Sequence, residues 1–217
     1  LLLALLLTIF GSLVYGLADA VRGIERGLLW PLVGIGTLLG WGLASSTLAG
    51  WTAAILSLAT GVLLVGLRVG RLGGVLGSLW GDLVDLIRQA LQGKIPLDTM
   101  PIQQAWVELG HAVISLVTRL NEWLLALAGN QPIFDPVPIA LLWALALWGG
   151  VIWACWAVRR RAQPLLGVLP AVALLASTLA YVGGRALYLV PMLAAALVLK
   201  ALVEHECRRR EWQEMRY

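Results

Sequence analysis

Charged residues are scarce in this chain of 217 residues. Only 13% of its residues are charged and 60% are hydrophobic, and the mean hydropathy is +0.85. A soluble domain has about 25% charged residues, so this composition excludes an ordinary soluble domain and indicates an integral membrane protein. The net charge of +4 forms no broad basic face, because the arginines stand in short clusters at the ends of apolar runs. We therefore expect no nucleic-acid partner.

Cysteine and histidine occur only twice each, which leaves little material for a catalytic or metal site. Cys155 lies inside an apolar run, where cysteine usually acts as a small apolar residue, whereas Cys207 lies in a charged tail. His111 and His205 have no cysteine at metal-ligand spacing. The sequence also lacks a glycine-rich phosphate loop with a lysine. We therefore expect no catalytic residue, no metal and no cofactor in this chain.

Long apolar runs are what the chain has in abundance. Twenty residues of α-helix rise about 30 Å, roughly the thickness of the hydrocarbon core of a bilayer. The interiors of the runs hold almost no ionisable side chains, which argues against an ion-coupled transporter. The runs predict an all-α, polytopic membrane helical bundle of about six spans, formed by residues 1–17, 28–48, 51–67, 139–158, 164–182 and 186–203.

The first run has a second interpretation, a cleaved signal peptide. Ala18, Asp19 and Ala20 follow the run and have the form of a cleavage site. No charged segment precedes the run, which favours a membrane span.

Two segments between the third and fourth runs have a different pattern. In residues 75–92 and 102–127, polar residues recur every three or four positions opposite an apolar face. This spacing predicts two amphipathic helices that either lie flat in one leaflet interface or pack on the protein. Their nearly balanced charge favours packing on the protein. The polar positions are Ser78, Asp82, Asp85, Gln89 and Gln92 in the first segment and Gln104, Glu108, His111, Ser115, Arg119 and Glu122 in the second.

Two arginine clusters orient the predicted spans. Two runs separate the clusters, so both lie on one side, and basic clusters prefer the cytoplasm. The clusters are Arg159, Arg160 and Arg161 after the fourth run and Arg208, Arg209 and Arg210 after the sixth. The predicted organisation is three spans in residues 1–67, an extracytoplasmic amphipathic region in 68–138, three spans in 139–203 and a cytoplasmic basic tail in 204–217.

Glycine and tryptophan are frequent, with 24 and 11 copies. Gly36 and Gly40 form a GxxxG pair that would let two helices approach closely, although glycine is common in membrane helices in any case. Tryptophans near the ends of runs are typical of the membrane interface. A tryptophan-lined cleft for haem or lipid near Trp143, Trp148 and His111 is a less favoured alternative.

Four short motifs together give a family resemblance. They are Gly129-Asn130-Gln131-Pro132-Ile133-Phe134-Asp135-Pro136, Leu141-Leu142-Trp143, the triple arginine at 159–161 and the tail residues 205–212. With them the chain resembles the N-terminal membrane region of bacterial transglutaminase-like membrane proteins. Such proteins have a multi-span N-terminal part, an extracytoplasmic transglutaminase-like domain with a Cys-His-Asp site, and often a later anchoring helix. Nothing here matches that site, so the resemblance carries over no catalytic residue.

The resemblance implies a membrane anchor and scaffold, not an enzyme. The catalytic, Cys protease-like domain would lie outside this chain, and a start without methionine and an abrupt stop at Tyr217 fit a piece of a longer protein. The implied location is the bacterial inner membrane, with the lipid bilayer and a C-terminal extracytoplasmic domain of the same protein as partners. The alternative is a self-contained, non-enzymatic membrane subunit or a small-molecule or lipid carrier.

Overall fold

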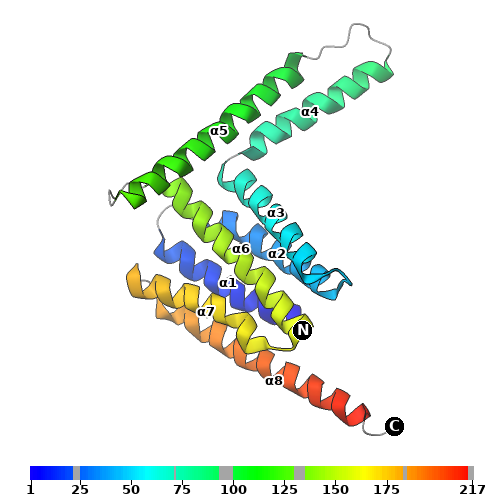
Figure 1. Ribbon diagram of the computed structural model, residues 1–217, viewed down its shortest axis with the longest axis vertical. Coiled ribbons are helices and arrows are strands. Elements are labelled where there is room, and N and C mark those ends of the chain that lie inside the picture. Colours follow the sequence, from blue (N-terminus) through cyan, green and yellow to red (C-terminus); the bar gives the residue numbers. More distant parts are fainter. Residues whose placement is uncertain (22–24, 71, 93–99, 130–134, 183–184, 215–217) are drawn as a thin grey trace. The chain divides into compact units, whose positions relative to one another are not determined.

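The computed structural model describes the chain except for residues 22–24, 71, 93–99, 130–134, 183–184 and 215–217 (Figure 1). The described residues form α-helices and one short 3-10 helix, with no strand among them, so the predicted all-α class is confirmed. The elements are α1 (Leu2–Ala20), α2 (Arg26–Ser45), α3 (Gly50–Val69), α4 (Leu72–Leu91), α5 (Met100–Ala128), α6 (Pro136–Arg161), α7 (Pro164–Tyr181), η1 (Ala186–Tyr188) and α8 (Leu189–Glu214).

Five stretches of the described chain are long and apolar enough to cross a membrane. They are α1, α2, α3, α6 and Ala186–Arg209, which joins η1 to most of α8. The length and composition of these five stretches therefore agree with the expectation of several membrane-spanning helices. α7 is shorter, and its apolar part is Pro164–Ala180. The six-span count thus stays a prediction that depends on α7.

The chain divides into two compact units. The first comprises Leu1–Val62 and Leu142–Tyr217, and the second comprises Leu63–Leu141. α3 and α6 each contribute residues to both units. The first unit therefore contains α1, α2, α7 and α8 together with the larger parts of α3 and α6.

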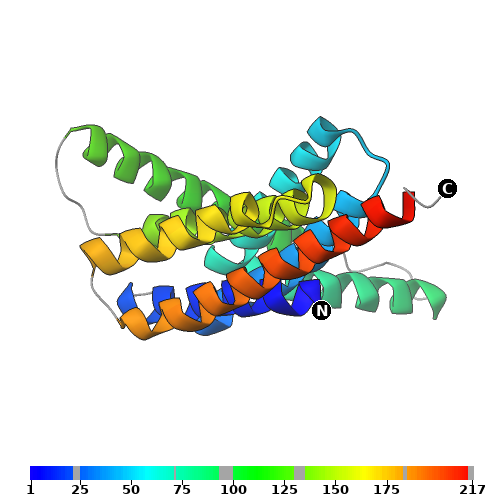
Figure 2. The ribbon, with the colours of Figure 1, turned by 90° about the horizontal axis from the view of Figure 1, so that it is seen from below.

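α1 forms the core of the first unit. α2, α7 and α8 all contact it, and α1, α7 and α8 run side by side in Figure 2. Every residue from Ile9 to Val14 is buried, and Leu6, Phe10 and Leu13 are 0% exposed. A stretch that is buried on every side needs apolar or small residues on every side, which is the composition of residues 9–14.

Gly36 and Gly40 let α2 pack closely against α6. A Cβ atom added to Gly40 would lie 3.0 Å from Cys155 Cβ and 3.3 Å from the Cα of Ile152. The Cys155 thiol donates to the Thr37 carbonyl oxygen, with Sγ 3.6 Å from the oxygen. Of the two interpretations of this GxxxG pair, close helix packing is therefore the correct one.

α6 begins at an N-terminal cap provided by Asp135. Asp135 Oδ1 accepts a hydrogen bond from the Val137 amide, 3.0 Å away, and Pro136 occupies the first helical position, where an amide would have no helical partner. Arg119 of α5 donates to both oxygens of the same carboxylate, over 2.9 and 3.1 Å. Only 17% of the Asp135 side chain is exposed. One carboxylate thus caps α6 and ties it to α5 within the second unit.

α4 and α5 form a helical hairpin in the second unit (Figure 1). The least exposed residues of each helix recur every three or four positions, which is the spacing of a packed helix–helix seam. In α4 they are Leu72, Leu76, Leu79, Asp82, Leu86 and Gln89, and in α5 they include Ile102, Ala105, Leu109, Ala112, Leu116 and Leu120. The hairpin is thus held by a seam that is mostly apolar and includes Asp82 and Gln89 on α4.

A second set of large apolar side chains on the hairpin is exposed. At about 100° per residue, these residues fall on the same side of both antiparallel helices, next to the seam. We call this set the apolar flank: Trp80, Val84, Ile87 and Leu91 on α4, and Trp106, Val113, Val117 and Leu124 on α5, each at least 38% exposed. Beyond the seam, eight large apolar side chains of the hairpin therefore share one exposed flank, while others, such as Ile114 and Leu125, are exposed elsewhere.

Aspartate in place of Leu109 or Leu120 should destabilise the hairpin by about 2 kcal/mol or more, because each substitution puts a charge into the seam. The matched control is Gln104→Asp on the exposed polar side of α5, which should be nearly silent. Thermal unfolding of the purified protein, followed by circular dichroism, measures both effects. Similar losses from the seam and the polar side would contradict the proposed seam.

Candidate functional site

An apolar cleft lies in the first unit, between the end of α2, the start of α3 and the second half of α6. Its volume is about 620 Å³, within the size range of small-molecule sites. Among the described residues that line it, Arg161 alone is charged. The walls include Leu43, Ala54, Leu58, Leu145, Gly149 and Ile152, together with the tryptophans at 148, 153 and 156. The cleft therefore suits a ligand that is mostly apolar.

Trp148 fixes the inner wall of the cleft. Its indole Nε1 donates to the Ser57 carbonyl oxygen on α3, 2.9 Å away, and the side chain is 3% exposed. Gly61 lies against the same indole, and a Cβ atom there would collide with the ring nitrogen. The absence of a side chain at Gly61 thus makes room for Trp148 to reach the α3 backbone.

The arginines at the end of α6 lie over aromatic rings. Arg160 Cζ is 4.4 Å from the centre of the Trp156 ring, and Arg160 Nη1 donates to the Leu48 carbonyl oxygen over 3.1 Å. Arg161 Cζ is 5.8 Å from the centre of the Trp153 ring. Stacking on tryptophan attracts a cation and orders its long side chain. One end of the cleft is therefore basic, and the rest of it is apolar.

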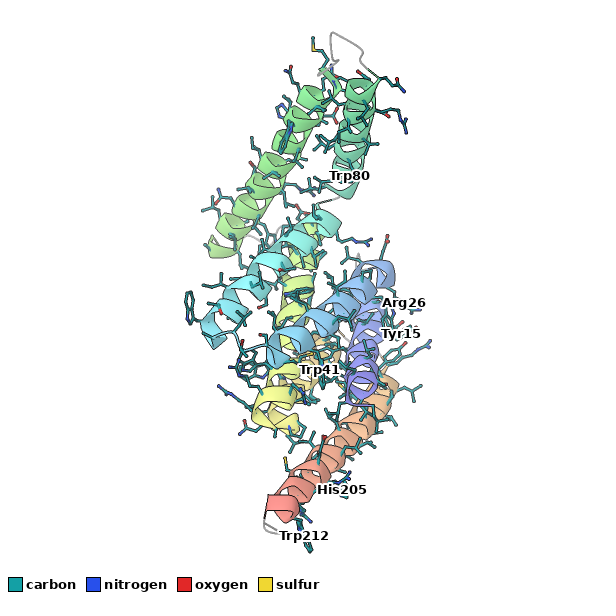
Figure 3. The ribbon with its side chains drawn as sticks, turned by 90° about the vertical axis from the view of Figure 1, so that its right-hand side faces the viewer. Tyr15, Arg26, Trp41, Trp80, His205 and Trp212 are labelled. Carbon is teal, nitrogen blue, oxygen red and sulfur yellow. The ribbon has the colours of Figure 1, made fainter. Side chains whose placement is uncertain are left out.

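A second, more polar pocket of about 500 Å³ lies in the same unit. Arg159 at the end of α6 and Arg209 on α8 both line it, with His205, Glu206 and Trp41. Trp41 and His205 are labelled in Figure 3. The first residues of α1 also line this pocket. It therefore brings together one residue from each of the two arginine clusters that the sequence singled out.

The remaining candidate residues do not gather in one place. Cys155 is fully buried, and Cys207 lines a small pocket with Arg159 and Glu206. His111 is exposed on α5 and belongs to the second unit, whereas the cleft belongs to the first. Of the three residues named for a tryptophan-lined cleft, Trp148 alone lines this one. In the described chain, no three or more histidine, cysteine, aspartate or glutamate side chains form a group that could hold a metal ion.

Sequence reasoning did not identify the backbone and small-residue parts of the cleft. The Ser57 carbonyl, Gly61 and Gly149 carry no chemical signal in the sequence. Trp153 and Trp156 are three residues apart and so share one side of a helix, and this was the one available signal.

Comparisons with protein-family models, curated proteins and solved structures find no match.

Proposed function

We propose that this chain is the membrane anchor and scaffold of a transglutaminase-like membrane protein whose catalytic domain lies outside it. The observation that carries the proposal is the set of five helical stretches long and apolar enough to cross a membrane, among them α1, which α2, α7 and α8 contact. The enzyme class rests on the sequence resemblance alone. The second candidate is a self-contained membrane subunit. A cargo lipid bound in the apolar cleft would favour this second candidate.

In the proposed topology α7 is the sixth span, and both arginine clusters face the cytoplasm. The 18 residues of α7 rise about 27 Å, close to the hydrocarbon thickness, and α7 contacts α1 and α8 along the bundle. If α7 crosses the membrane, the C-terminal ends of α6 and α8 lie on the same side of it. The shared pocket of Arg159 and Arg209 supports that arrangement.

An aromatic cluster supports the position of the opposite membrane interface. Tyr15 near the end of α1 packs edge-on against Trp30 of α2 and stacks on Tyr188 of η1, with ring centres 6.0 and 6.4 Å apart. Arg26 Cζ lies 5.0 Å from the centre of the Tyr15 ring, and the two side chains are adjacent in Figure 3. Tyrosine and tryptophan concentrate at headgroup level. The proposal places this cluster at the extracytoplasmic surface.

The α4–α5 hairpin is proposed to lie on that extracytoplasmic side, with its apolar flank in the leaflet interface. Its polar side carries both acidic and basic residues and would face water. An amphipathic element of this kind binds a membrane surface through its buried apolar area. Burial in the leaflet interface, as proposed here, and packing on the protein, which the charge balance favours, would both cover this flank.

The isolated chain is expected to show no thiol-dependent amine incorporation and no peptide hydrolysis. Cys155 is 0% exposed, and its thiol donates a hydrogen bond to the Thr37 carbonyl oxygen. Acyl transfer needs an accessible thiolate beside a base. Cys155→Ala should fold normally, since alanine removes only one buried sulfur atom. Turnover by the purified chain that disappears in Cys155→Ala or Cys207→Ala would contradict the anchor role.

The native protein tests the proposal directly. The chain has a mass of 23.4 kDa, so an anchor should be found in its source membrane as part of a much larger polypeptide with thiol-dependent transglutaminase activity outside the cell. The measurement is the intact mass of the native protein together with that activity. A native protein of about the same mass as this chain would instead favour the self-contained subunit.

A further inference from the structure

The walls of the cleft offer a ligand almost only carbon surface. The Trp148 indole nitrogen is already bonded to the Ser57 carbonyl, and the Ser57 hydroxyl donates to the Ala54 carbonyl oxygen, 2.9 Å away. With these polar groups satisfied inside the protein, a polar ligand would lose its hydration along the wall without compensation. A hydrocarbon chain has no such cost.

The basic end of the cleft has unused capacity to bind an anion. In the described part of the chain, no carboxylate forms an ion pair with Arg160 or Arg161. Arg160 uses one nitrogen for the Leu48 carbonyl, while Arg161 lines the cleft and lies beside Trp153. A guanidinium has five N–H donors in a planar fork that matches phosphate geometry.

The length of the cleft fits one lipid molecule. Its lining on α6 extends from Leu145 to Arg161, which is about 24 Å of helix. One leaflet with its headgroups is roughly 20–22 Å thick, half of a complete bilayer. We propose that this cleft binds one anionic phospholipid, with an acyl chain along Trp148 and Ile152 and the phosphate at Arg161. This proposal rests on the membrane location, and it holds for an anchor and for a self-contained subunit alike.

Native mass spectrometry of the purified full chain tests the headgroup. The probe is an equimolar mixture of phosphatidylglycerol and phosphatidylcholine with identical acyl chains. The wild type should retain phosphatidylglycerol preferentially, because the choline cation of phosphatidylcholine offsets the charge of its phosphate. Arg161→Gln should reduce that preference about fivefold to tenfold, since it removes the cation that favours a lipid with a net negative charge. Arg161→Lys should keep part of the preference. Arg88→Gln, at an exposed arginine of α4, is the control and should change nothing.

A cleft-filling variant tests the position of the acyl chain. Gly149 lines the cleft, and a Cβ atom there meets nothing within 4 Å, so we expect the side chain of Gly149→Leu to fill part of the cleft. It should lower retention of both lipids at least fivefold. Gly34→Leu is the control, since Gly34 also faces open space but does not line the cleft.

Three results would overturn the proposal. The first is equal retention of the two lipids by the wild type, which is the behaviour of ordinary surrounding lipid. The second is an unchanged preference in Arg161→Gln, and the third is unchanged retention in Gly149→Leu. None of these results bears on the number of spans, so failure here is distinguishable from failure of the proposed topology.

Discussion

Gly40→Leu is expected to separate α2 from α6 and to lower the thermal stability of the protein more than any other single glycine substitution in α2. An added Cβ atom would lie 3.0 Å from Cys155 Cβ and 3.3 Å from both Cys155 Sγ and the Ile152 Cα. The last of these atoms is backbone and cannot rotate away. Overpacking at such a contact costs about 1–3 kcal/mol, and a leucine at a small-residue helix interface also removes the close approach itself.

Gly42→Leu is the matched control for that prediction. Gly42 lies two residues further along α2, and a Cβ atom there meets nothing within 4 Å. Both substitutions exchange glycine for leucine in the same helix, so differences in helix propensity cancel. Thermal unfolding in detergent should show a clear loss for Gly40→Leu and little change for Gly42→Leu. Equal melting temperatures for the two variants would show that α2 and α6 do not pack through Gly40.

Asp135→Ala is expected to destabilise the second unit strongly. It removes the cap on the Val137 amide, which is worth about 1 kcal/mol, and it leaves the Arg119 guanidinium without the partner of its two hydrogen bonds. The Asp135 side chain is largely shielded from solvent, so water compensates for the loss less than at the surface. The combined effect should be about 2–3 kcal/mol.

The control for this change is Asp85→Ala on α4. Asp85 also pairs with an arginine, Arg88, but the two side chains are 65% and 67% exposed and lie on one helix. Exposed pairs of this kind contribute about 0.3–0.5 kcal/mol. The two unfolding curves compare the loss of stability from a shielded ion pair that also caps a helix with the loss from a surface ion pair. If Asp85→Ala is as damaging as Asp135→Ala, the cap and its arginine do not stabilise α6.

Hydropathy was enough to predict the helical class and most apolar helices, because hydrocarbon thickness fixes the length of a span. It was less able to locate helix ends. α2 begins at Arg26 and continues through Pro31, its sixth residue, although proline there removes one helical hydrogen bond and crowds the carbonyl four residues earlier. α8 continues to Glu214, because glutamate and arginine are good helix formers even where they end the apolar run.

The hairpin and the cleft were harder to predict for a different reason. The periodic pattern of α5 gives one broad apolar face, but it does not say that Leu109 and Leu116 join a seam while Trp106 and Val113 stay exposed. The cleft depends on where α2, α3 and α6 leave space between them, and on a carbonyl of Ser57. Every residue has a carbonyl, so its role becomes visible only when the helices are placed.

Cysteine accessibility in intact cells tests the central claim, a six-span protein with both arginine clusters in the cytoplasm. Single cysteines would be placed at Arg160, Arg209, Asp85 and Glu108 in a chain that carries Cys155→Ala and Cys207→Ala, and labelled with a membrane-impermeant maleimide. We expect no labelling at 160 and 209 until the cells are opened, and immediate labelling at 85 and 108 on the hairpin. If α7 does not cross the membrane, 160 and 209 lie on opposite sides. Labelling of either of them from outside would therefore contradict the account.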